Sequence, residues 1–143
     1  MSGEQKTWQR LTEPHSGADL ADVQGRAVRD GDDWLITGQK IWISGQRKPD
    51  LLFGPMVTDT DAPRHRNLGY FMVPFPSEGL DQERMNLLSG DDQSVFFFDN
   101  VRVPGDHLIG GENQGWQVTQ TTLEIEHGGR GQVVPIDGAM ENL

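Results

Sequence analysis

The stretch RAVRDGDDWLIT (residues 26–37) places two short runs of β-prone residues on either side of an Asp-Gly pair. An Asp-Gly pair in this position is a strong signal for a tight turn between antiparallel strands. We therefore predict a β-hairpin, with strands at residues 26–29 and 34–37. Similar short runs bounded by turn residues recur along the chain. The hairpin pattern therefore indicates the fold class of the whole chain.

Outward from the hairpin, the same kind of run predicts further strands at residues 39–44, 51–58, 68–73, 80–85, 94–98 and 101–103. Pro55 lies inside one of these runs and has no N–H to donate, so we expect that run at a sheet edge or a bulge. The apolar spacing from Trp116 to Ile125 predicts one helix of about three turns. The fold class is therefore all-β: an antiparallel β-barrel or sandwich of about seven strands with one short C-terminal helix.

The length of 143 residues predicts one domain with a single core. Its 18 Gly and 8 Pro suit many strands joined by tight turns. The net charge of -10 repels phosphate backbones and anionic lipids, so we expect no nucleic-acid and no membrane partner. No run resembles a signal peptide or a span of ~20 apolar residues, which predicts a cytoplasmic protein. With no Cys and four scattered His, we expect no metal site.

Four blocks carry a more specific signal: TEPHSGAD (12–19), GQKIWISG (38–45), VFFFDNVRVP (95–104) and LIGGENQGW (108–116). In this order they resemble the middle, flavin-contacting β-domain of the acyl-CoA dehydrogenases, over residues 4–130. The resemblance divides the chain into an N-terminal segment (1–10), the middle β-domain (11–114), a helix like the start of the family's following helical domain (115–127) and a loose tail (128–143). The helical domains that flank this β-domain in the family have no counterpart in the sequence.

The resemblance implies an FAD site at Leu11, Thr12, Trp42 and Ser44. The chemistry of the residue types at these positions suits a flavin. A Thr hydroxyl can donate to the pyrimidine edge of the ring without adding charge, and the indole of Trp42 offers a flat apolar face. Ser44, two residues beyond Trp42 in a strand, points to the same side and would reach flavin N5. The ordinary alternatives are that the TEP segment is only a turn and that Trp42 belongs to the core.

Two departures from the family pattern concern an acyl-CoA substrate. Gly17 and Ala18 occupy the expected substrate-binding positions, but Ala18 lacks the hydroxyl that helps to hold the CoA arm. His15 stands where the family has glycine, and a positive φ there would suit His less well than Gly. The catalytic base implied by the resemblance is Glu126, within LEIEH (123–127), although a Glu on an exposed helix is more often only solvated.

Two functions follow from these observations. The first is a truncated acyl-CoA dehydrogenase-like β-domain that is inactive alone and keeps residual flavin, nucleotide or protein binding. The alternative is one subunit of a split FAD-dependent acyl-CoA dehydrogenase, completed by a helical partner chain. FAD affinity should be weak in either case, and apolar flanks left without helices predict self-association.

Overall fold

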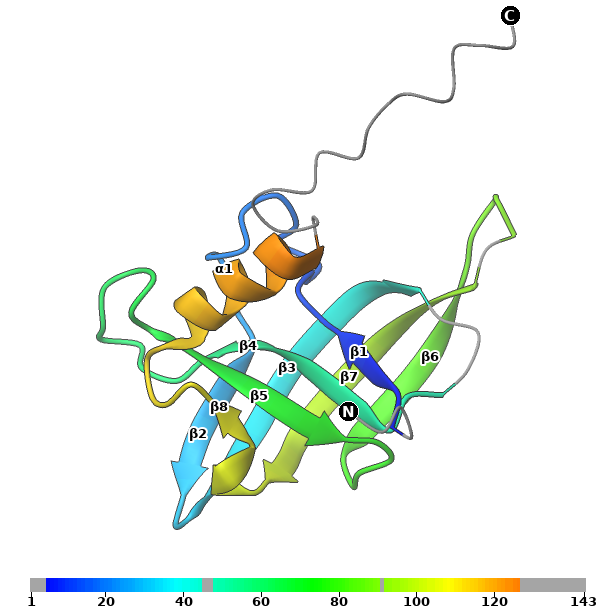
Figure 1. Cartoon of the computed structure of the whole chain (residues 1–143). Helices are drawn as coiled ribbons and strands as arrows, with labels where there is room; N and C mark the ends of the chain where they lie inside the picture. The colour runs from blue at the N-terminus through cyan, green and yellow to red at the C-terminus, as the bar shows by residue number, and fades with distance from the viewer. Residues whose placement is uncertain (1–4, 45–47, 91, 127–143) are drawn as a thin grey trace, which may run out of the picture.

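The structure is a computed structural model, and it describes residues 5–44, 48–90 and 92–126 (Figure 1). In this part of the chain, eight strands form one sheet, and one α-helix follows them. The elements in chain order are β1 (Thr7–Gln9), β2 (Arg26–Asp30), β3 (Asp33–Ser44), β4 (Leu51–Val57), β5 (Leu68–Pro74), β6 (Leu80–Asn86), β7 (Asp92–Val103), the 3₁₀ turn η1 (Gly105–His107), β8 (Leu108–Ile109) and α1 (Gly115–Glu126).

The strand order is β6-β7-β3-β2-β4-β5-β8, and β1 lies beside β4 off this path. Most neighbours are antiparallel, but β4 pairs in parallel with both β1 and β2. The all-β prediction is confirmed. Of its two forms, the sandwich-like one fits, because the sheet is open and mixed and does not close into a barrel.

Two predicted pairs of strands are continuous in the structure. The runs at 34–37 and 39–44 join through Gly38 into β3, and the runs at 94–98 and 101–103 join into β7. The register between β3 and β7 shifts at Gly38, where an added Cβ would lie 2.8 Å from Cα of Gly25. A side chain at Gly38 therefore has no room. The short strands β1 and β8 were not predicted, since their few residues carry no alternating pattern.

Pro55 does not lie on an edge strand, so that expectation was wrong. β4 has β5 on one side and has β1 and β2 on the other. The pairing with β1 ends at Phe53, and the pairing with β2 involves Val57. Pro55 lies in the gap between these two partners, where its missing N–H costs no ladder bond.

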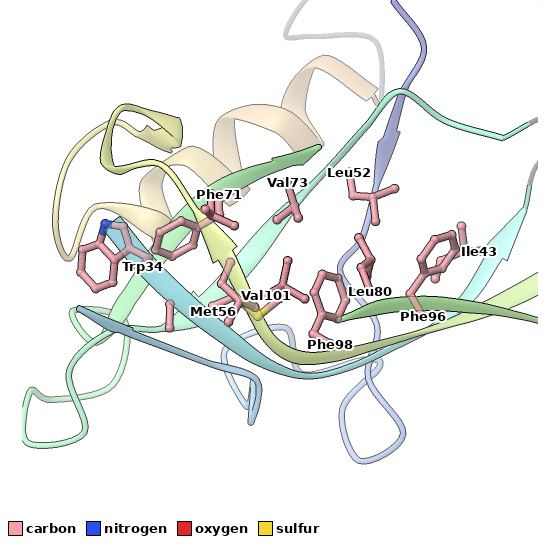
Figure 2. Packing of buried hydrophobic residues seen from close by; sticks show 13 residues of the cluster. Trp34, Ile43, Leu52, Met56, Phe71, Val73, Leu80, Phe96, Phe98 and Val101 are labelled. Carbon is pink, nitrogen blue, oxygen red and sulfur yellow. The ribbon is translucent and has the colours of Figure 1, made fainter. Parts of the chain in front are cut away.

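The core lies on the concave side of the curved sheet. Figure 2 shows its side chains converging between the β3–β7 ribbon and the β4–β5 ribbon. Trp34 packs edge to face on Phe71, with ring centroids 5.3 Å apart, and Phe75 packs similarly on Phe96 at 5.6 Å. Aromatic pairs in this geometry add to the free energy gained by burying their area.

The predicted C-terminal helix is present as α1, which packs against β4 and β5 of its own chain. Its first residue, Gly115, lies so close to β5 that an added Cβ would approach the backbone of Leu68 and Gly69 to 2.7 Å. Thr119 is fully buried in the same contact. The predicted helix end at residue 127 and the loose tail at 128–143 lie outside the described residues.

Candidate flavin site

The loop that carries TEPHSGAD is held against the sheet by main-chain hydrogen bonds. Arg10 N donates to Phe53 O of β4 at 2.8 Å, and Ile41 N of β3 donates to Thr12 O at 2.9 Å. Glu13 and Ser16 then bond each other's backbone and close a tight turn. Thr12 is thereby fixed beside the residue that precedes Trp42.

A buried ion pair fixes the same loop from beneath. Lys40 Nζ lies 2.7 Å from Glu13 Oε1, and the two side chains are 0% and 3% exposed. Lys40 also donates to Pro55 O at 2.9 Å, while Glu13 accepts from the backbone N–H of Gln24 and Gly25. Burial lowers the pKa of Lys40, and the adjacent Glu13 carboxylate opposes that shift. Through these hydrogen bonds the pair ties the loop to β3 and β4 at once.

Arg10, which precedes this loop, is also buried, but its side chain has no carboxylate or hydrogen-bond partner in the described part of the chain. Its side chain is 2% exposed, and its guanidinium lies 3.8 Å from the ring centroid of Phe96 and 5.5 Å from that of Trp8. None of its three guanidinium nitrogens has a hydrogen-bond partner in the described part of the chain. Burial lowers its pKa to about 9, so the group stays charged at neutral pH.

Trp42 is turned outward by a β-bulge. The register with β7 shifts between Lys40 and Ile43, and Trp42 has a φ of 57°, in the left-handed region that non-glycine residues seldom adopt. Consequently Ile43 is buried, whereas Trp42 is 53% exposed. The alternative that Trp42 is a core residue is therefore wrong. Ser44 is exposed on the same side, and its hydroxyl accepts a hydrogen bond from Gln93 Nε2 at 2.8 Å.

The four predicted flavin positions thus lie near one another where β3 ends. Leu11 and Thr12 approach β3 through the bond to Ile41, and Trp42 and Ser44 follow directly on that strand. The donor set suits a flavin ring: a hydroxyl and main-chain groups beside a half-exposed indole. Bound FAD would supply a hydride acceptor at this place.

The proposed substrate-binding residues lie on the same loop. Gly17 and Ala18 are exposed, and a Cβ added to Gly17 would lie 3.7 Å from Cγ2 of Thr12. His15 is not among the non-glycine residues of positive φ in the described chain, so its backbone is not strained as the glycine comparison suggested.

Glu126, the predicted base, is the last residue of α1 and is exposed. Its helix packs on β4 and β5, whereas Trp42 and Ser44 stand at the end of β3. Burial raises the pKa of Tyr70, beneath the same helix, to about 12, and the charge of Glu126 adds to this shift. Glu126 thus lacks the buried surroundings that would prepare a catalytic carboxylate.

A hollow of about 560 Å³ lies between α1 and the loop before β5. His65 and Trp116 stack across it with ring centroids 4.5 Å apart, and Arg66 also lines it. The neighbouring Arg64 is paired with Asp19. The basic cluster at residues 64–66 is therefore partly neutralised.

Sequence reasoning missed Arg10, Glu13, Lys40 and Gln93. A usable signal existed for Lys40, because it continues the inward alternation of Trp34 and Ile36 and so required a buried carboxylate. Within the described residues, no three metal-binding side chains cluster together. The helix in this part of the chain is also too short and too polar to cross a bilayer.

The fold is a β-domain in which a half-exposed Trp42 and the Thr12 loop meet where β3 ends. The chain belongs to the acyl-CoA dehydrogenase family, since the model of that family's middle domain matches residues 9–101. FadE34 of Mycobacterium tuberculosis, named an acyl-CoA dehydrogenase, is 36% identical over 146 residues, covering 100% of this chain and 20% of FadE34. FadE26 of the same organism is 33% identical over 135 residues, covering 92% of this chain and 34% of FadE26.

Solved structures agree with this assignment. The Tcur3481-Tcur3483 steroid ACAD matches with a TM-score of 0.79 and 35% identity, over 84% of this chain and 31% of that chain. The ChsE4-ChsE5 complex from Mycobacterium tuberculosis matches with a TM-score of 0.78 and 33% identity, over 85% of this chain and 32% of that chain. This chain therefore spans about a third or less of the proteins that it matches.

Proposed function

We propose that this chain is the flavin-facing β-domain of an acyl-CoA dehydrogenase, which binds FAD weakly and does not oxidise acyl-CoA by itself. The observation that carries this proposal is the meeting of Thr12 and the outward-turned Trp42 where β3 ends. The strained backbone of Trp42 costs folding free energy, and such strain is concentrated at ligand-binding sites in proteins. A half-exposed indole held in this way is therefore explained by a ligand that packs on it. FAD binding, and a cytoplasmic location, remain predictions.

Each residue has a definite part in this proposal. Thr12 donates to the pyrimidine edge, where negative charge gathers on reduction, and Trp42 covers one face of the ring. Leu11 provides apolar contact, Ser44 donates toward N5, and Gly17 and Ala18 accept the CoA arm. Glu126 takes the substrate α-proton only when further helices bury it beside the substrate.

The proposal is tested by titrating the chain with FAD, using equilibrium dialysis and tryptophan fluorescence, with and without a medium-chain acyl-CoA. We expect saturable binding in the micromolar range or weaker that is lost from Trp42→Ala and Thr12→Ala. Val28→Ser is a suitable control, because Val28 is 61% exposed on β2 and takes no part in the site. Absence of FAD uptake by the wild-type chain, or equal uptake by Trp42→Ala, would contradict the proposal.

A second function, one subunit of a split enzyme, is favoured by the solved relatives whose names join two components, ChsE4-ChsE5 and Tcur3481-Tcur3483. Here a helical partner chain, or a second copy of this chain, would cover the flavin edge. The test is co-expression with the helical portion of a FadE34-type relative, followed by an acyl-CoA assay with an artificial electron acceptor. Activity that appears only in the mixture supports the split enzyme, and activity of the isolated chain refutes both proposals.

A further inference from the structure

A side chain on β7 controls the direction of the Ser44 hydroxyl. Ser44 and Gln93 are directly paired in the register of β3 and β7, and Gln93 Nε2 donates to Ser44 Oγ at 2.8 Å. Gln93 is half-buried and is paired on its other side with Met85 of β6. Its position between two neighbouring strands restricts where its amide can go.

The chemistry of the two groups gives this hydrogen bond a direction. A hydroxyl has one proton to donate and two lone pairs that accept, while an amide NH₂ only donates. Because Gln93 occupies a lone pair of Ser44, the serine proton must point elsewhere. Ser44 is exposed, as Trp42 is, so a ligand on this side can accept that proton.

We propose that Gln93 is a positioning residue, which keeps the Ser44 hydroxyl as a hydrogen-bond donor to the N5 edge of a bound flavin. This inference rests on the proposed flavin site and adds a residue that acts through Ser44 without touching the flavin. A hydroxyl aimed in advance saves the cost of fixing its direction when the ligand arrives.

The other end of the Gln93 amide is buried. Gln93 Oε1 is shielded from solvent and has no hydrogen-bond partner among the described residues. An unmet buried acceptor costs about 1–3 kcal/mol. Rotating the amide would offer Oε1 to the Ser44 proton, but it would then consume the one proton that the flavin needs. The rotated amide would make one bond to Ser44 as well and would bury its NH₂ without a partner, so only the present orientation leaves the Ser44 proton free to donate.

Gln93→Glu is the sharpest test, because glutamate has the same shape and, when ionised, can only accept. It turns the Ser44 proton away from the flavin. We expect FAD affinity, measured by equilibrium dialysis, to fall roughly fivefold to tenfold, the size of one hydrogen bond. Ser44→Ala should cause a similar loss. The ¹⁵N resonance of flavin labelled at N5 should move in the same direction in both variants, which a purely structural role for Gln93 would not produce.

The double variant separates this effect from the added negative charge. In the Ser44→Ala background, Gln93→Glu should change FAD affinity by less than twofold, and circular dichroism should show intact folding throughout. An unchanged or tighter affinity in Gln93→Glu, or a full loss that persists without Ser44, would overturn the inference while the proposed function stands. A wild-type chain that takes up no FAD would overturn both.

Discussion

Trp34 and Trp42 lie on the same strand, an even number of residues apart, and yet they face opposite sides of the sheet. Trp34 is 4% exposed and packs on Phe71, whereas Trp42 is 53% exposed. In an unbroken strand both side chains would point inward. The bulge after Lys40 inserts one residue and reverses the alternation. One end of β3 therefore builds the core, and the other end presents an aromatic surface.

The bulge in β3 divides the strand into two parts. Trp34 on one side of it contributes to the stability of the core, and Trp42 on the other side is free to contact a ligand. The strained φ of Trp42 costs free energy of the order of 1–3 kcal/mol, and the folded sheet must supply it. The tight packing around Trp34 and the buried pair of Lys40 and Glu13 stand on either side of the strand's midpoint. Substitutions at the two ends of β3 should consequently have different effects.

The largest effect is expected for alanine at the two tryptophans. Trp34→Ala leaves a large cavity against Phe71 and should lower the free energy of unfolding by about 3–5 kcal/mol. Trp42→Ala should change it by about 0.5 kcal/mol or less, because the side chain is mostly in solvent. Urea denaturation measures both values. Equal destabilisation by the two substitutions would mean that Trp42 also belongs to the core.

The ion pair of Lys40 and Glu13 lies between the two ends of β3, and substitutions of these residues test how much it stabilises the fold. Lys40→Met leaves the Glu13 carboxylate buried without its cation and should cost about 3–5 kcal/mol of stability. The Lys40→Met, Glu13→Gln double variant should recover part of this loss, since a neutral amide oxygen still accepts from Gln24 and Gly25. Thermal unfolding measures both proteins. A double variant less stable than Lys40→Met would contradict the pairing.

Tyr70 reports on the face of β5 that α1 covers, opposite to the face where Trp34 contacts Phe71. It is the only tyrosine in the sequence, and burial raises its pKa to about 12. The unfolded chain loses the phenol proton at about pH 10, while the folded chain retains it. Stability should therefore be independent of this group below pH 10 and fall by about 2–3 kcal/mol between pH 10 and 12.

The phenolate absorbance of the native protein measures this pKa directly. Titration of the native phenol at about pH 10, its ordinary value, would show that solvent reaches Tyr70 and that α1 does not cover β5 as described.

The smallest effect is expected at Arg10, beneath the flavin-facing loop. Arg10→Met removes a buried charge without hydrogen-bond partners and keeps a long side chain against Phe96. We expect a gain of about 1 kcal/mol, because the desolvation cost exceeds the cation–π attraction that is lost. The measurement is the shift of the urea midpoint. A loss above about 1 kcal/mol would show that the guanidinium contributes to stability through contacts beyond these rings.

Local signals predicted much of the fold. The Asp-Gly turn at residues 30–31 predicted the hairpin of β2 and β3, and the spacing from Trp116 to Ile125 predicted α1. The parallel pairing of β1 with β4 could not be predicted, because it joins Thr7 to Leu51 and leaves no local pattern. Closure of a barrel likewise depends on contacts between distant strands.

The candidate site was only partly visible in the sequence. The resemblance pointed to Leu11, Thr12, Trp42 and Ser44, and the structure places them near one another where β3 ends. The outward turn of Trp42 depends on a bulge, which is set by its pairing with β7. The role of Gln93 was hidden for the same reason, since only the register with Ser44 brings the two together.

The indole N–H signals of the four tryptophans test the central claim most directly, because Trp8, Trp34, Trp42 and Trp116 sample different parts of the molecule. Two-dimensional ¹H–¹⁵N spectra would be recorded while FAD is added to the chain. The flavin-facing edge predicts that the Trp42 signal shifts in a saturable way, while the Trp34 signal stays in place. A Trp42 signal that does not move at saturating FAD, with shifts confined to the other tryptophans, would contradict the account.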